Sequence, residues 1–159
     1  MNNTRRFAAY HWFAAVFLLA FGLNACTVQY VSRYDEATER SITSIQRTVE
    51  GLLQSIESRL GTPEADYENF AETYEQLHVD AALLNTRAQA IELNSITAEQ
   101  SALLIGWLEN LESLHKTGFP NVPEVLLIPK QQASQIFVAM LRFELAKKRE
   151  LVTPTIDGE

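Results

Sequence analysis

The stretch that decides the fold is EATERSITSIQRTVEGLLQSIESRL, residues 36–60. Apolar side chains recur along it at alternating spacings of three and four, a period that places them on one face of a helix. They are Ile42, Ile45, Val49, Leu52, Ile56 and Leu60. Asp35, directly before the stretch, is a residue type that caps helix N-termini. The pattern predicts a long helix over about residues 36–60 with one apolar face to bury.

The segment that follows, Gly61-Thr62-Pro63-Glu64, contains the signals for a new helix. It offers a helix stop, a capping residue, a proline suited to the first helical position and an acid for the first turn. A second helix is therefore expected to start at once. Its apolar row, again spaced by three and four, is Tyr67, Phe70, Tyr74, Leu77, Ala81, Leu84, Ala88 and Ile91.

A third and a fourth helix are predicted further along the chain. Thr97 and Gln100 have the spacing of a capping box, and Gly118 ends the third helix, whose row is Leu104, Trp107, Leu111 and Leu114. Residues 125–128 are expected to form a buried extended piece or an early helical turn. From about Pro129 the fourth helix carries Ala133, Ile136, Phe137, Met140 and Phe143 and ends in Lys147-Lys148-Arg149, as its negative C-terminal dipole favours.

Four helices with one apolar face each, joined mostly by short turns, bury those faces best by running antiparallel around one core. The expected fold class is all-α, an up-and-down antiparallel four-helix bundle over residues 35–150, with a flexible tail at 151–159. The alternative is a three-helix body with an appended arm, if residues 119–128 do not return the fourth helix to the bundle.

The N-terminal residues have the pattern of a targeting segment. Arg5 and Arg6 precede an apolar run over residues 7–23, and this run ends in Leu23-Asn24-Ala25-Cys26, which holds the only cysteine. At about 17 residues the run lies at the lower limit for spanning a bilayer, so an uncleaved anchor helix is the alternative interpretation.

These features resemble the precursors of bacterial lipoproteins, and the resemblance covers the first 26 residues. It implies a signal peptide at 1–25, cleavage before Cys26, and attachment of acyl chains such as palmitate to Cys26, with a lipidated tether at 26–34. Thr27 stands where an aspartate commonly retains such proteins at the inner membrane. The resemblance therefore implies a position on the periplasmic side of the outer membrane.

The charge of the mature chain limits its partners. The full chain has 13 basic and 20 acidic residues, and loss of Arg5 and Arg6 would change the formal net charge from −7 to −9. An acidic surface repels phosphate backbones, so we expect no nucleic-acid partner. Membrane contact is expected through the lipid anchor, together with a protein partner in the envelope.

Two Glu-x-x-His pairs are the candidate metal ligands: Glu75 with His78, and Glu112 with His115. Helix bundles bind paired metal ions with two such pairs and a glutamate from each remaining helix, here Glu50 or Glu57 and Glu144. Measured from a turn at about Asn94, however, the two histidines differ by five residues, roughly 7.5 Å along the helix axis. The competing interpretation is that both are surface pairs giving weak local support to their helices.

No other motif indicates a catalytic or cofactor site. Met140 is interpreted as core rather than as a haem ligand, and Tyr67, Phe70, Tyr74 and Trp107 as core rather than as a sugar-binding platform. We therefore expect no enzyme and no cofactor beyond the lipid on Cys26. The expected function is a structural or protein-interaction lipoprotein of the envelope, and the alternative is a small-ligand or metal-binding bundle.

The lipid anchor predicts a defined N-terminus. Mass spectrometry of the protein extracted from native membranes should find Cys26 as the first residue and carrying acyl chains. The matched control, Cys26→Ser, should keep residues 1–25 because the acylated sulfur is absent. An intact Met1 with a free thiol on Cys26 would contradict the anchor.

Overall fold

The computed structural model describes residues 31–119 and 122–152. The chain divides into two compact units, Met1–Tyr30 and Val31–Glu159, and the described residues belong to the second. The predictions for Cys26, the signal peptide and most of the C-terminal tail therefore lie outside the described residues.

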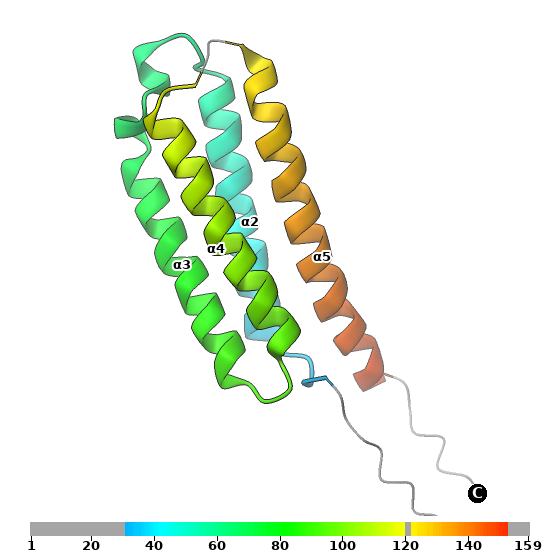
Figure 1. Ribbon diagram of the computed structural model, residues 1–159. Helices are drawn as coiled ribbons and strands as arrows, with labels where there is room; N and C mark the ends of the chain where they lie inside the picture. Colours follow the sequence, from blue (N-terminus) through cyan, green and yellow to red (C-terminus); the bar gives the residue numbers. More distant parts are fainter. Residues whose placement is uncertain (1–30, 120–121, 153–159) are drawn as a thin grey trace, which may run out of the picture. The chain divides into compact units, whose positions relative to one another are not determined.

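Four helices make up the described unit: α2 (Glu36–Glu57), α3 (Ala71–Ala90), α4 (Ser95–Lys116) and α5 (Leu127–Val152). They run alternately up and down (Figure 1), and each packs against its two neighbours, with α5 closing the ring on α2. The predicted antiparallel four-helix bundle is confirmed. The three-helix alternative is wrong, because α5 returns along α2 and contributes Phe137 and Met140 to the common core.

The predicted rows of apolar residues form one core, except that Leu114 of the third row is 41% exposed. Its largest buried side chains include Tyr74, Phe137 and Met140, which confirms Met140 as core. Phe70 is also buried, whereas Tyr67 and Trp107 are partly buried at the border of the core. The expected first row gains Leu53 and loses Leu60, which lies beyond the end of α2 and is only partly buried. The buried members from α2 are Ile42, Ile45, Val49, Leu52, Leu53 and Ile56.

The second helix starts later than predicted. Two 3-10 turns, η1 (Pro63–Ala65) and η2 (Tyr67–Asn69), precede α3, which begins only at Ala71. Thr62 does not cap a helix, because its hydroxyl donates a hydrogen bond to the Arg59 carbonyl at 2.7 Å. The Ala65 carbonyl accepts a hydrogen bond from the His115 ring at 2.7 Å rather than from a helical amide. The side chain of a distant helix thus competes with local helix formation.

The capping box predicted for the third helix is also wrong. Helix α4 begins at Ser95, so Thr97 lies inside the helix, where it is buried. Its hydroxyl donates to the carboxylate of Glu144 on α5 at 2.8 Å. The predicted end is correct, since α4 stops at Lys116 and Gly118 follows with φ of 85°, a conformation that favours glycine.

The fourth helix is longer than predicted at both ends. A 3-10 turn, η3 (Pro123–Leu126), leads directly into α5 at Leu127, which supports the early helical turn rather than the extended piece for residues 125–128. The predicted burial of this segment holds for Leu126 but is wrong for Leu127 and Ile128, which are 60% and 65% exposed. At its other end α5 continues through Lys147-Lys148-Arg149 to Val152.

Helices α3 and α4 form the most extensive contact in the bundle, and α4 and α5 the least extensive of the four neighbouring pairs. Small buried residues, Ala81 and Ala88 on α3 and Ser101 on α4, face this contact from the two helices. The Asn85 side chain donates hydrogen bonds to the Ala98 carbonyl at 2.9 Å and the Ser101 hydroxyl at 2.8 Å. Small side chains and this amide let the two backbones approach closely.

Asp35 caps α2 as predicted and also joins it to α3. Its carboxylate accepts hydrogen bonds from the amides of Ala37 at 3.3 Å and Thr38 at 3.2 Å. The Arg87 guanidinium binds the same carboxylate at 2.6 and 3.0 Å. These donors, Arg87 first, hold the pKa of Asp35 well below its usual range.

In the part of the chain that the structure describes, no helix is both long and apolar enough to cross a membrane.

The double role of Asp35 predicts a graded loss of stability. Asp35→Ala removes the cap and the ion pair and should lower the free energy of unfolding by about 2 kcal/mol. Asp35→Asn keeps a capping oxygen but not the charge, so it should cost about 1 kcal/mol or less. Urea unfolding of both variants tests this, and equal losses would contradict the role of the cap.

Candidate functional site

The structure separates the four residues predicted as metal ligands. His78 and Glu112 meet across α3 and α4, with 2.8 Å between His78 Nε2 and Glu112 Oε2. Glu75 is exposed on α3, and His115 is buried, with only 2% of its surface exposed. The interpretation of Glu112 and His115 as a surface pair is therefore wrong for His115, whose partners lie on other elements.

Glu112 is the centre of a polar cluster at the border of the core. Its Oε1 accepts hydrogen bonds from the Tyr67 hydroxyl at 2.7 Å and from the Lys116 ammonium at 2.8 Å. Its Oε2 accepts the hydrogen bond from His78. These three donors, with Lys116 the strongest, lower the pKa of Glu112 to about 2. Lys116 also lies 4.8 Å from the centre of the Tyr67 ring, a cation–π contact. The cluster keeps the carboxylate ionised and fully engaged.

His115 connects three elements. Its Nε2 lies 2.7 Å from the Ala65 carbonyl, which can only accept, so the ring proton is assigned to Nε2. Its Nδ1 then accepts the hydrogen bond from the Tyr74 hydroxyl at 3.1 Å, and burial raises the pKa of Tyr74. Phe119 stacks on the ring with 4.8 Å between centroids. Because both ring nitrogens are engaged, neither offers a free lone pair to a metal ion.

The glutamates considered for the other two helices lie apart from this cluster. Glu50 accepts a hydrogen bond from Gln46 at 2.8 Å, and Glu57 pairs with Lys130 at 2.6 Å. Glu144 is buried near the α3–α4 turn, beside Asn94 and Thr97. Among the described residues, no three histidine, cysteine or acidic side chains are grouped so that they could hold a metal ion.

The region around Glu144 contains a buried charge pair that sequence reasoning missed. Lys147, predicted as a helix-end cation, is only 4% exposed, and Glu144 is 1% exposed. The ammonium donates to Glu144 at 2.7 Å, to the Asn94 side chain at 2.7 Å and to the Thr97 hydroxyl at 3.0 Å. All three donors of Lys147 are thereby satisfied. In the sequence, this pair could be recognised only from the spacing of three residues between Glu144 and Lys147. The same spacing is found on exposed helix faces, so it does not indicate burial.

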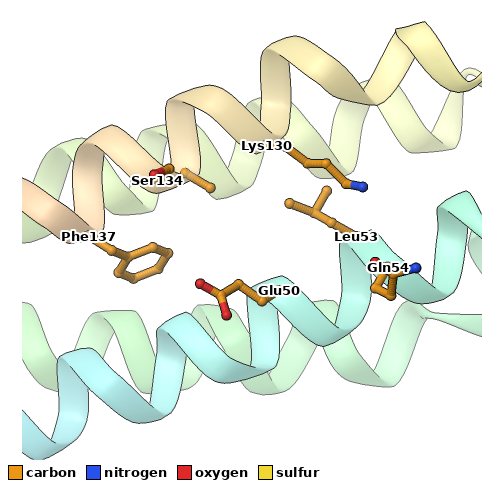
Figure 2. A pocket seen from close by; sticks show the side chains of 7 residues that line it. Glu50, Leu53, Gln54, Lys130, Ser134 and Phe137 are labelled. Atoms are coloured by element: carbon orange, nitrogen blue, oxygen red, sulfur yellow. The ribbon is translucent and has the colours of Figure 1, made fainter.

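Two surface hollows are small or polar. The first, about 180 Å³, lies between α2 and α5 over Leu53, Ala133 and Phe137. Figure 2 shows Glu50 and Gln54 on α2 facing Lys130 and Ser134 on α5 at its rim. The second, about 460 Å³, opens beside Tyr67, His115 and Lys116. The first is smaller than ordinary ligand pockets. Lys130 and Lys116 are already paired with Glu57 and Glu112, and Glu50 accepts a hydrogen bond from Gln46.

The third hollow is apolar and lies between α4 and α5, the helices that contact each other least. We call it the α4–α5 groove; it has a volume of about 290 Å³ and is lined by Gln100, Leu103, Gln135, Ile136, Ala139 and Met140. Leu103 is 69% exposed. The buried side-chain oxygen of Gln100 has no hydrogen-bond partner. Beside the groove, Trp107 Nε1 donates to the Gln132 side chain at 3.3 Å.

The sequence held a signal for this groove. Leu103 on α4 lies outside the buried row of that helix, so it is an apolar side chain left over after the core is formed.

Compared with protein-family models, with curated proteins and with solved structures, the chain gives no match. Its candidate sites are therefore argued from the geometry alone.

The Glu112 cluster predicts a specific acid sensitivity. The folded pKa of about 2 lies below the ordinary value of 4.5, so the unfolded chain binds a proton at Glu112 first as the pH falls. The stabilisation is complete above about pH 4.5 and is lost toward pH 2. Over this range wild type should lose on the order of 1–3 kcal/mol more stability than Glu112→Gln.

Urea unfolding at several pH values measures this difference. Glu75→Gln, which changes an exposed carboxylate on α3, is the matched control and should follow wild type. An equal pH dependence in wild type and Glu112→Gln would contradict the role of the three donors.

Proposed function

We propose that the chain is a lipid-anchored, periplasm-facing module of the bacterial envelope that binds another envelope protein through the α4–α5 groove. The anchor follows from the residues around Cys26. The observation that carries the binding role is the groove itself, an apolar hollow beside the 69% exposed side chain of Leu103.

The chemistry of the groove suits a helical partner. An amphipathic helix can place apolar side chains between Leu103 and Ile136, which removes apolar surface from water on both partners. Gln135, which lines the groove, offers a side-chain amide for hydrogen bonds. These features favour a protein partner over a small charged ligand.

The state of the titratable side chains supports binding rather than catalysis. The two ring nitrogens of His115 are engaged by the Tyr74 hydroxyl and the Ala65 carbonyl, and Glu112 is held by three donors. A general acid or base needs access to the substrate's proton. Buried or fully engaged groups of this kind serve the packing of the helices.

The second proposal is a metal or small-ligand site, favoured by the contact between His78 and Glu112. Their side chains are 29% and 17% exposed, so an ion could reach them if it displaced the hydrogen bond between His78 Nε2 and Glu112 Oε2, with water completing its coordination. Stoichiometric metal in the purified full chain that is lost in His78→Ala would replace the first proposal by this one.

Site-specific photocrosslinking in intact cells tests the groove. A photoreactive amino acid at Leu103 should give one adduct of defined mass with an envelope protein. The matched control is Leu83, which is 63% exposed on α3, away from the groove, and should give little of that adduct. Ile136→Lys combined with the probe at position 103 should abolish the adduct, because it buries a charge in the interface. Equal adducts at positions 83 and 103, or persistence with Ile136→Lys, would contradict a role for the groove.

A further inference from the structure

The chain joins the bundle at a fixed point. Ser32 is 4% exposed, its amide donates to the Leu93 carbonyl at 2.9 Å, and its hydroxyl donates to the Asn94 side chain at 2.8 Å. Asn94 is held in turn by the Lys147 ammonium at 2.7 Å and donates to the Ala88 carbonyl at 3.2 Å. The residues that precede α2 are therefore fastened to the turn between α3 and α4. Helix α2 begins and α5 ends at this same end of the bundle (Figure 1).

The same turn presents two apolar side chains to solvent. Leu93 is 54% exposed and Ile96 is 44% exposed. Leu93 has φ of 59°, and in the described ranges it is the one residue other than glycine with a positive φ. A leucine in this left-handed region is strained, whereas glycine or asparagine adopts it readily. The turn thus exposes an apolar side chain at a conformational cost.

We propose that this end of the bundle rests on the lipid bilayer, with Leu93 and Ile96 in the interfacial layer. The proposal depends on the lipid anchor at Cys26. Only six residues lead from Cys26 to Ser32, and fully extended they span roughly 20 Å. A lipidated Cys26 therefore keeps the α3–α4 turn near the membrane surface, where Leu93 and Ile96 lose contact with water on insertion.

Attachment, rather than apolar character alone, decides which end faces the membrane. The opposite end also exposes apolar side chains, Leu127 at 60% and Ile128 at 65%. That end lies about 30 Å further away, because α3 has 20 residues and rises 1.5 Å per residue. Because the segment between Cys26 and Ser32 is short, it keeps the α3–α4 turn near the membrane surface and the end with Leu127 and Ile128 away from it.

The proposed contact has charges of both signs, and Glu92 is an exposed carboxylate beside Leu93. Arg87 pairs with Asp35 at 2.6 Å, and Lys148 pairs with Glu39 at 3.4 Å. Arg33 is exposed beside the attachment point. Although the chain as a whole is acidic, these basic residues reduce the repulsion from anionic head groups at this end.

Nitroxide labels on matched exposed glutamates test the orientation. With Cys26 acylated, Glu92→Cys in the α3–α4 turn and Glu64→Cys in η1 each provide one reactive thiol. The lipidated full chain is placed in vesicles of phosphatidylethanolamine and phosphatidylglycerol. A label at position 92 should be several-fold less accessible to a water-soluble nickel chelate than a label at position 64.

A second variant isolates the contribution of Leu93. Leu93→Asn relieves the backbone strain, so it should raise the midpoint of thermal unfolding by a few degrees. It should also restore at least half of the chelate accessibility at position 92, because the apolar contact is gone. An unchanged protection at position 92 would overturn the insertion of Leu93.

The remaining outcomes separate this inference from the anchor. If the protein floats with the vesicles and Cys26 carries acyl chains, but both labels are equally accessible or position 64 is the protected one, the orientation is wrong and the anchor stands. If Cys26 is free and the protein does not float, the anchor fails, and the orientation fails with it.

Discussion

The structure depends on one constraint: four helices, each with a single continuous apolar face, must share one core. No helix here could bury its row alone, because the row of α2 needs α3 and α5 on either side, and the rows of α3 and α5 need α4 to close the ring. Burial of these rows is the dominant favourable contribution to folding. The turn between α3 and α4 is short, and the longer connections, which contain η1, η2 and η3, cross the opposite end of the bundle, so consecutive helices run antiparallel (Figure 1).

Polar side chains fix how the helices sit against each other at both ends of the bundle. At one end His115 joins α4 to α3 through Tyr74 and to η1 through Ala65. At the other end Lys147 and Glu144 on α5 reach Asn94 and Thr97. Removing one partner of a buried charge pair is strongly destabilising, even where the pair itself adds little. These contacts fix how far each helix is shifted along its axis relative to its neighbours, which the burial of an apolar row does not fix by itself.

The same arrangement shapes the surface that we propose to be functional. Small residues and Asn85 lie on α3 and α4, which form the most extensive contact, whereas α4 and α5 contact each other least of the neighbouring pairs. Between these two helices the α4–α5 groove stays open above Met140. The attachment of Ser32 to the α3–α4 turn gives the bundle a defined end at which the chain enters. A proposed partner site along the side of the bundle and a proposed membrane contact at its end therefore occupy different surfaces and do not compete.

The sequence alone determined the elements that depend on local periodicity and local turn chemistry. The row from Ile42 to Ile56, the cap at Asp35 and the stop at Gly118 could be predicted, because each depends on residues within one or two helical turns. The tertiary structure decided which side chains meet across helices. His115 prevents an early start of α3 by binding Ala65, Glu144 draws Thr97 into a buried network, and His78 finds Glu112 rather than Glu75. Such pairs depend on the axial register of neighbouring helices, and the period of a single helix carries no information about that register.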